Sequence, residues 1–142
     1  MTIAYFDPSA LLKLFFAEPG SATARRACRA AATIASSRLL YAEARAALAA
    51  AARDPVRRFG KRQLSRAKEN LAEAWIHMVK VDAGEPVIQV ARDLAETRAL
   101  RGYDVVHLES ALRVSVDALV SSDAGLLRAA AACGVGVIDV RQ

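Results

Sequence analysis

The sequence is poor in the features that build disulfide frameworks, zinc sites and membrane spans. It has two cysteines, Cys28 and Cys133, which lie far apart and lack the C-x-x-C spacing of a metal or redox site. No apolar run approaches the roughly 20 residues that a transmembrane helix needs. Asp7 and Lys13 interrupt the first apolar run, so we expect no export signal. These absences predict a cytoplasmic protein in a reducing compartment that does not act at a membrane.

Linkers and repeats are also missing. The 142 residues contain no low-complexity segment, internal repeat or shift in composition that would mark a domain boundary. Hydrophobic residues make up 54% of the chain and charged residues 25%, a balance typical of globular proteins. A chain of this length buries one ordinary core, so we expect a single domain over residues 1–142.

Short β-type runs alternate with longer segments of helical periodicity. The apolar, β-branched and aromatic run at residues 2–6 is typical of a buried strand. The same criteria predict strands at 2–6, 33–36, 78–81, 118–121 and 135–140, and helices at 10–16, 21–32, 39–52, 61–77, 85–100, 105–114 and 124–132. Such alternation predicts an α/β fold in three layers, with helices on both faces of a central, mostly parallel sheet of about five strands.

Four acidic residues stand at junctions between these elements. Asp7 ends the first strand, Asp123 follows the strand at 118–121, Asp104 begins a helix, and Glu43 lies in the first turns of another. Each Asp could simply cap a helix, because Asp is among the preferred residues at that position. The carboxyl ends of parallel strands, however, form one edge of a sheet and create its ligand crevice. The four acids are therefore candidates for one shared site.

Carboxylates that converge in such a crevice repel one another. A raised pKa or a bound divalent cation relieves this repulsion. Oxygen ligands without a cluster of His or Cys favour hard ions such as Mg²⁺ or Mn²⁺. Such an ion activates water and neutralises charge at phosphorus, which is the chemistry of phosphodiester hydrolysis.

Four segments that carry these acids resemble the PIN domain, and in particular the VapC-type toxin ribonucleases of toxin–antitoxin pairs. The segments are YFDPSALLKLF, SSRLLYAEARAAL, LRGYDVVHLESAL and ALVSSDAGLLRAAAACGVGVID. The resemblance implies that Asp7 and Asp104 are the principal metal ligands, and that Glu43 and Asp123 complete the acidic catalytic cluster directly or through water. Ser121 matches the small hydroxyl residue often found two positions before the last acid. The resemblance also implies a Mg²⁺- or Mn²⁺-dependent ribonuclease, a homodimer, and inhibition by a small antitoxin protein.

The basic residues are concentrated in one segment. Six of the 20 basic residues but only one of the 15 acidic residues fall between Arg53 and Arg66, so this segment accounts for the net charge of +5. Focused positive charge attracts phosphate or an acidic peptide, whereas a solvated hairpin tip is the simpler interpretation. The candidates for contact with RNA or a protein partner are Arg57, Arg58, Lys61 and Arg62.

Other interpretations of the sequence remain open. His107, three residues after Asp104, could be a metal ligand or a base, but a lone histidine in a helix is more typical of a packed side chain. A phosphoacceptor receiver domain or a haloacid-dehalogenase-like phosphatase would need a second acid beside Asp7, where Pro8 and Ser9 stand. The stronger alternative is a non-catalytic PIN-like module that binds RNA or protein through the basic segment.

Overall fold

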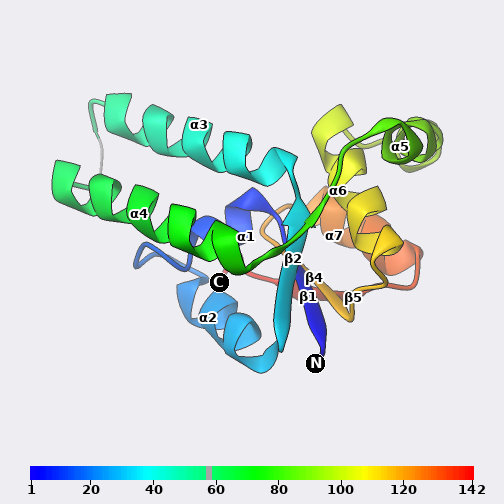
Figure 1. The fold of residues 1–142 in the computed structure, drawn as a ribbon, viewed down its shortest axis with the longest axis horizontal. Coiled ribbons are helices and arrows are strands. Elements are labelled where there is room, and N and C mark those ends of the chain that lie inside the picture. The colour runs from blue at the N-terminus through cyan, green and yellow to red at the C-terminus, as the bar shows by residue number, and fades with distance from the viewer. Residues whose placement is uncertain (57–58) are drawn as a thin grey trace.

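A parallel sheet lies between two layers of helices in the computed structural model, which describes residues 1–56 and 59–142 (Figure 1). The predicted α/β class and the five strands are confirmed. In chain order the described residues form β1 (Ile3–Phe6), α1 (Pro8–Leu12), α2 (Ser21–Ala30), β2 (Thr33–Ser37), α3 (Leu39–Arg53), α4 (Lys61–His77), β3 (Val79–Val81), α5 (Glu85–Arg98), α6 (Gly102–Arg113), β4 (Ala118–Ser121), α7 (Ala124–Ala132) and β5 (Gly136–Asp139).

The strand order is β3-β2-β1-β4-β5, and all four pairings are parallel. The central strand β1 pairs with β2 on one side and with β4 on the other. The sheet is therefore more regular than the mostly parallel one that the sequence predicts. Its chain order reverses direction between β1 and β4, which is a topological switch point.

Alternate residues of the central strands feed two separate cores. Phe6 and Val120 pack with the layer that contains α1, α2, α3 and α4, whereas Tyr5 and Leu119 pack with α6 and α7. A third apolar cluster joins α5 to α6 through residues such as Val87 and Val105. Because successive side chains of a strand point to opposite faces, these runs of apolar residues are buried on both sides.

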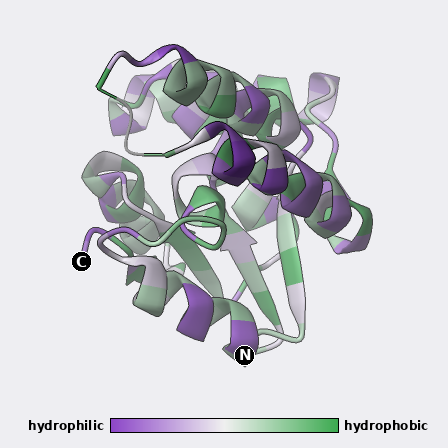
Figure 2. Cartoon of the chain, turned by 90° about the vertical axis from the view of Figure 1, so that its left-hand side faces the viewer, coloured by the Kyte–Doolittle hydropathy of each residue, from purple (hydrophilic) through white to green (hydrophobic). Residues whose placement is uncertain are grey.

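The helices α3 and α4 form a long hairpin that extends beyond the sheet (Figure 1). Leu48 of α3 and Leu64 and Leu71 of α4 are buried in one core cluster. Near the tip, the ring of Phe59 stacks on Phe16 with 4.2 Å between ring centroids, which ties the tip to the rest of the domain. Figure 2 looks onto this end of the molecule and shows hydrophilic stretches on the helices in front of a largely hydrophobic sheet.

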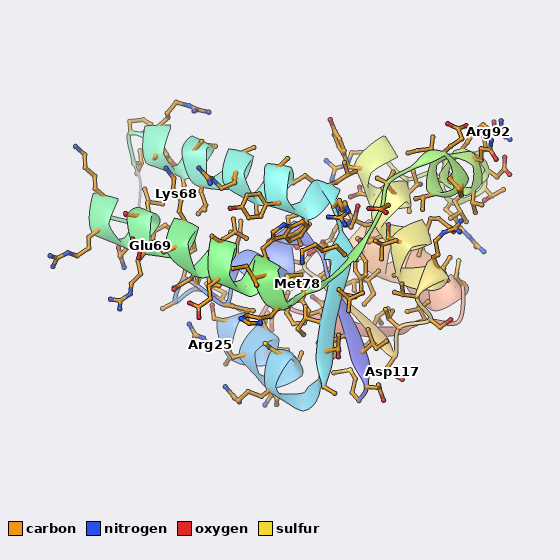
Figure 3. All side chains as sticks on the ribbon, in the orientation of Figure 1. Arg25, Lys68, Glu69, Met78, Arg92 and Asp117 are labelled. Atoms are coloured by element: carbon orange, nitrogen blue, oxygen red, sulfur yellow. The ribbon has the colours of Figure 1, made fainter. Side chains whose placement is uncertain are left out.

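The two edges of the sheet differ. At the amino-terminal edge, the Asp117 carboxylate accepts hydrogen bonds from the backbone N–H groups of Thr2 and Ile3, each at 2.8 Å (Figure 3). Asp117 thus fixes the start of β1. The acids of the predicted site belong to the opposite, carboxyl edge.

Two helix boundaries differ from the prediction in a way that affects this site. Helix α1 begins at Pro8 instead of residue 10, because the Asp7 carboxylate accepts the N–H of Ala10 at 2.9 Å and so caps the helix. Helix α6 begins at Gly102 with Arg101 as its cap residue, so that Asp104 lies in the first turn instead of preceding the helix. Among the described helices, none combines the length and the apolar character needed to cross a membrane.

Candidate active site

The switch point between β1 and β4 brings three predicted site residues to one place. Asp7 directly follows β1, Ser121 ends β4, and Asp123 lies two residues beyond it. The backbone N–H of Asp7 donates to the carbonyl of Val120 at 3.2 Å, which holds the ends of the two strands together. In open α/β sheets the crevice at such a point is the usual place for a ligand.

Asp7 is buried and accepts three hydrogen bonds from the chain. Its Oδ1 accepts from the Ser9 hydroxyl at 2.7 Å and from the N–H of Ala10, and its Oδ2 accepts from the Ser121 hydroxyl at 2.5 Å. Only 5% of the residue is exposed. Burial raises the pKa of Asp7 above its ordinary value, and the hydrogen bonds from Ser121, Ser9 and Ala10 only partly offset this. The Asp7 carboxylate is thus largely removed from water, which would otherwise stabilise its negative charge.

Ser121 connects Asp7 to Asp123. Its hydroxyl donates to Asp7 and accepts the backbone N–H of Asp123 at 2.9 Å. The Asp123 carboxylate in turn accepts the N–H of Leu126 at 2.8 Å and caps helix α7. Asp7 and Asp123 are therefore both helix caps and both neighbours in one site, so the two interpretations offered by the sequence are compatible.

Asp104 and Asp123 share one cation. The Arg101 Nε donates to Oδ2 of Asp104 at 3.0 Å, and a terminal nitrogen of the same guanidinium lies 3.4 Å from Oδ2 of Asp123. The Arg101 side chain is 79% exposed, whereas those of Asp104 and Asp123 are 15% and 33% exposed. The acids of α6 and α7 are thus joined by an arginine at the surface.

Glu43 is connected to helix α6 and strand β1 through a buried histidine. Its Oε1 lies 2.7 Å from Nε2 of His107, and Nδ1 of His107 lies 2.6 Å from the hydroxyl of Tyr5 on β1. His107 and Tyr5 are almost fully buried. The backbone N–H of Ser37 donates to the same Tyr5 hydroxyl at 3.0 Å.

The chemistry of Glu43 gives the direction of one of these hydrogen bonds. Burial raises the pKa of Tyr5 far above its ordinary value, so the hydroxyl keeps its proton while it is hydrogen-bonded to Nδ1 of His107. Nε2 of His107 donates to Glu43, because a carboxylate only accepts. His107 is a packed histidine, as the sequence indicates, and it also orients Glu43.

The predicted acids are linked around one edge, but they are not arranged as a ready ligand set. Asp7 and Asp123 share Ser121, Asp104 and Asp123 share Arg101, and Glu43 is joined to α6 one turn after Asp104. Within residues 1–56 and 59–142, no three His, Cys, Asp or Glu side chains lie close enough together to hold a metal ion as they stand. The assignment of these acids as metal ligands therefore stays a prediction.

Sequence reasoning missed three residues that shape the site: Arg101, Ser9 and Tyr5. Arg101 lies in a segment that reads as a turn, although a basic residue three positions before an acid at a helix start is the spacing of an ion pair. Ser9 lies two residues after Asp7, and its hydroxyl also accepts the N–H of Ser122 at 3.0 Å. Tyr5 belongs to an apolar strand, where nothing in the sequence distinguishes it from its neighbours.

As far as the described residues show it, the basic segment lies apart from these acids, where α3 ends and α4 begins (Figure 1). Lys61 and Arg62 are exposed at the start of α4 and line a shallow surface hollow together with Ser65, Arg66 and Glu69. The other two candidates for contact with RNA or a partner, Arg57 and Arg58, lie outside the described residues.

Comparison with known protein families gives a match over most of the chain. The PIN domain family matches residues 4–132. Two curated relatives are Ribonuclease VapC45 of Mycobacterium tuberculosis (strain CDC 1551 / Oshkosh) and Ribonuclease VapC49 of Mycobacterium tuberculosis (strain ATCC 25618 / H37Rv). Each is 42% identical to this chain over 120 residues, which cover 84% of this chain and 82% of the relative.

Solved structures share the fold at lower sequence identity. PAE2754 from Pyrobaculum aerophilum matches with a TM-score of 0.71 and 23% identity, covering 98% of this chain and 90% of that one. VapC20 of Mycobacterium tuberculosis, described as a Sarcin-Ricin loop cleaving toxin, has a TM-score of 0.68 and 14% identity, with 98% and 99% coverage. FitAB bound to an IR36 DNA fragment has a TM-score of 0.66 and 16% identity, with 98% and 96% coverage.

Proposed function

Because this chain belongs to the PIN-domain family and, within it, to the VapC ribonucleases, we propose that it is a ribonuclease acting as the toxin of a toxin–antitoxin pair. The observation that carries the proposal is the 42% identity to Ribonuclease VapC45 over 84% of the chain. The reaction is hydrolysis of RNA phosphodiester bonds. The acids at the switch point of the sheet are the groups suited to it.

The donor chemistry of this site fits Mg²⁺ or Mn²⁺. Asp7, Glu43, Asp104 and Asp123 offer carboxylate oxygens, which hard cations prefer, and the edge that they share lacks a Cys. The chain also places a cation of its own, the Arg101 guanidinium, between two of these acids. We assign Asp7 and Asp104 as the principal ligands, with Glu43 and Asp123 directly or through water.

Neighbouring residues of the chain orient the carboxylates that would hold the ion. When bound, the ion would lower the pKa of a water molecule and neutralise the charge that develops at phosphorus. Ser9 and Ser121 hold the two oxygens of Asp7 in place, and His107 holds Glu43. Such supporting hydrogen bonds orient carboxylates so that little rearrangement accompanies the reaction.

A cleavage assay tests this proposal. We expect purified protein to cleave RNA with Mg²⁺ or Mn²⁺ and to stop when a chelator is added. Asp7→Asn should lose the activity, whereas Asp93→Asn, an equal change at an exposed acid of α5, should keep it. The competing function is a non-catalytic module that binds RNA or protein. Absence of Mg²⁺ and Mn²⁺ binding, or cleavage that a chelator leaves unchanged, would favour that alternative.

The partners follow from the same family membership. We propose that the chain forms a homodimer in the cytoplasm and that a small cognate antitoxin protein occupies the acidic site and blocks it. Expression of the chain alone should arrest growth, and co-expression with the product of a neighbouring short reading frame should restore growth. Sedimentation of the purified chain measures the dimer directly, and a monomer at all concentrations would contradict that part of the proposal.

The basic hairpin tip is proposed as a second contact with the RNA backbone. Exposed Lys61 and Arg62 stand at the start of α4 with few acids nearby to neutralise them. Each contact with a phosphate releases about one counterion, so its loss lowers the slope of log affinity against log salt by about 1. We expect this change for Arg62→Ala, measured in the Asp7→Asn background so that RNA stays intact. Lys68→Ala, further along the same helix, is the control, and equal slopes for the two variants would contradict the proposal.

A further inference from the structure

The Arg101 guanidinium is a positive charge that the chain itself supplies to the candidate metal site. It contacts Asp104 at 3.0 Å and Asp123 at 3.4 Å, although these acids belong to different helices. Arg101 is the cap residue of α6, and its extended backbone (φ −67°, ψ 158°) directs the chain into the helix that carries Asp104. One flexible side chain thus neutralises two carboxylates that would otherwise repel each other.

The ion pairs of Arg101 with Asp104 and Asp123 are weak, so a competing cation can replace the arginine. Arg101 is 79% exposed, so water and salt compete for its charge, and exposed ion pairs are weak. Asp7 differs, because its carboxylate is held by Ser9, Ser121 and the N–H of Ala10, which belong to the folded chain and cannot leave. The arginine would therefore weaken the binding of a divalent cation between these acids only modestly. The cation could not, however, use Oδ2 of Asp104 and Oδ2 of Asp123 while the guanidinium occupies them.

We propose that Arg101 competes with the divalent cation for Asp104 and Asp123, and that it leaves these carboxylates when the ion binds. Arg101 is a positioning residue in this scheme, since it keeps the two acids at one place until the ion replaces it. The inference rests on the proposed function in one respect, namely that these acids bind a divalent cation. It requires no particular RNA and no particular cleavage site.

The binding of Mn²⁺ alone, measured by isothermal titration calorimetry without RNA, tests the competition. Arg101→Gln removes the charge and keeps a polar side chain, and we expect it to bind Mn²⁺ about three- to tenfold more tightly than the unchanged protein, in line with the loss of two weak exposed pairs. Arg98→Gln is the matched control. It removes the same net charge from an exposed arginine three residues earlier, for which no ion pair occurs within the described part of the chain. At about 0.15 M salt, distant charges are largely screened, so Arg98→Gln should change the affinity little.

Each possible result of this titration either supports or overturns the proposal. Tighter binding by Arg101→Gln than by Arg98→Gln supports the proposal, as does binding that appears only in Arg101→Gln. Equal affinities of the two variants, weaker binding by Arg101→Gln, or no binding by any of the proteins would overturn it. Arg101→Lys keeps the charge but loses the forked guanidinium, and its affinity should fall between those of the unchanged protein and Arg101→Gln.

A second measurement follows the arginine itself. The side-chain Nε–H signal of Arg101 in nuclear magnetic resonance spectra should shift on titration with Mg²⁺, in step with the occupancy of the site. A signal that stays constant while Mg²⁺ binds would overturn the proposal. Cleavage assays distinguish this failure from that of the function. Metal-dependent RNA cleavage with equal Mn²⁺ affinities overturns the competition alone, whereas the expected affinities without cleavage overturn the ribonuclease alone.

Discussion

The two sides of the acidic site neutralise charge in different ways. On the β1 side, Asp7 is 5% exposed and its carboxylate is surrounded by hydroxyl and N–H donors of the chain. On the α6 side, Asp104 faces an arginine that is 79% exposed. Fixed donors hold a carboxylate in place but leave its charge poorly compensated, as the raised pKa of Asp7 shows. An exposed arginine compensates the charge and can leave.

This difference suggests a division of labour. The β1 side supplies a rigid carboxylate whose uncompensated charge favours a cation, and the α6 side supplies carboxylates that can be released to receive it. Changes on the β1 side should therefore have large effects on chemistry and on the pH dependence of stability. Changes at the arginine should alter affinity while leaving the fold untouched.

The largest effect is expected at Asp7. Asp7→Asn removes the charge but keeps an oxygen that can accept from Ser9 and Ala10, so helix α1 keeps its cap. Stabilisation of charge by a bound metal is worth several kcal/mol, so the rate of RNA cleavage should fall by about a hundredfold or more. Single-turnover cleavage measures the rate, and circular dichroism checks the fold. A folded Asp7→Asn protein with more than a tenth of the original rate would contradict this assignment.

A smaller effect is expected at His107, which serves the Glu43 side. His107→Leu leaves the Tyr5 hydroxyl and Glu43 without their shared partner. We expect a decrease of about 1–3 kcal/mol in the free energy of unfolding and a loss of about 10- to 100-fold in metal affinity or activity. His107→Gln, whose amide can both donate and accept, should recover part of the metal affinity. If the two variants lose stability equally and bind Mn²⁺ as the unchanged protein does, His107 has only a packing role.

The pH dependence of stability reports on Asp7 in the absence of metal. Because burial raises its pKa, the folded protein binds this proton more tightly than the unfolded chain does. The stability that the proton contributes is fully present below the ordinary value of 3.8 and is lost as the pH rises through the folded pKa. Asp7→Asn does not titrate and lacks this loss. Chemical denaturation with chelator from about pH 4 to about pH 8 should show the stability of Asp7→Asn rising relative to the unchanged protein, and a constant difference would contradict the shift.

The smallest effect on folding is expected at Arg101. Its contacts with Asp104 and Asp123 are exposed and screened, so Arg101→Gln should leave the melting temperature of the metal-free protein unchanged within error. Differential scanning calorimetry measures this. A clear decrease in melting temperature would mean that the arginine is part of the structural support of α6 and not an exchangeable cation.

The sequence predicts the order of strands and helices because the relevant signals are local. Apolar runs that end at Phe6 and Ser121 mark the two central strands. Asp7 and Asp123, which follow these runs, cap helices α1 and α7. The observed boundaries differ from the predicted ones by a few residues. Helix α6 starts before Asp104, and β5 is confined to Gly136–Asp139 within the predicted range 135–140.

The contacts of the site could be predicted only in part, because they join residues that are distant in sequence. The shared edge of Asp7 and Asp123 follows from the parallel sheet. The hydrogen bonds of Tyr5 to His107 and of His107 to Glu43 span 102 and 64 positions and depend on how α3 and α6 pack over β1. No local pattern encodes such a contact. The resemblance of the four segments to the PIN domain indicates the acids, but the position of Arg101 between Asp104 and Asp123 depends on the fold.

The acids of this site come from segments spread along the chain. Asp123 reaches Asp7 only after β4 has paired with β1 (Figure 1). During translation, a nascent chain that has already exposed Asp7, Glu43 and Asp104 still lacks the strand that brings Asp123 and Ser121 beside them. The site is therefore assembled only after β4 has been made and has paired with β1.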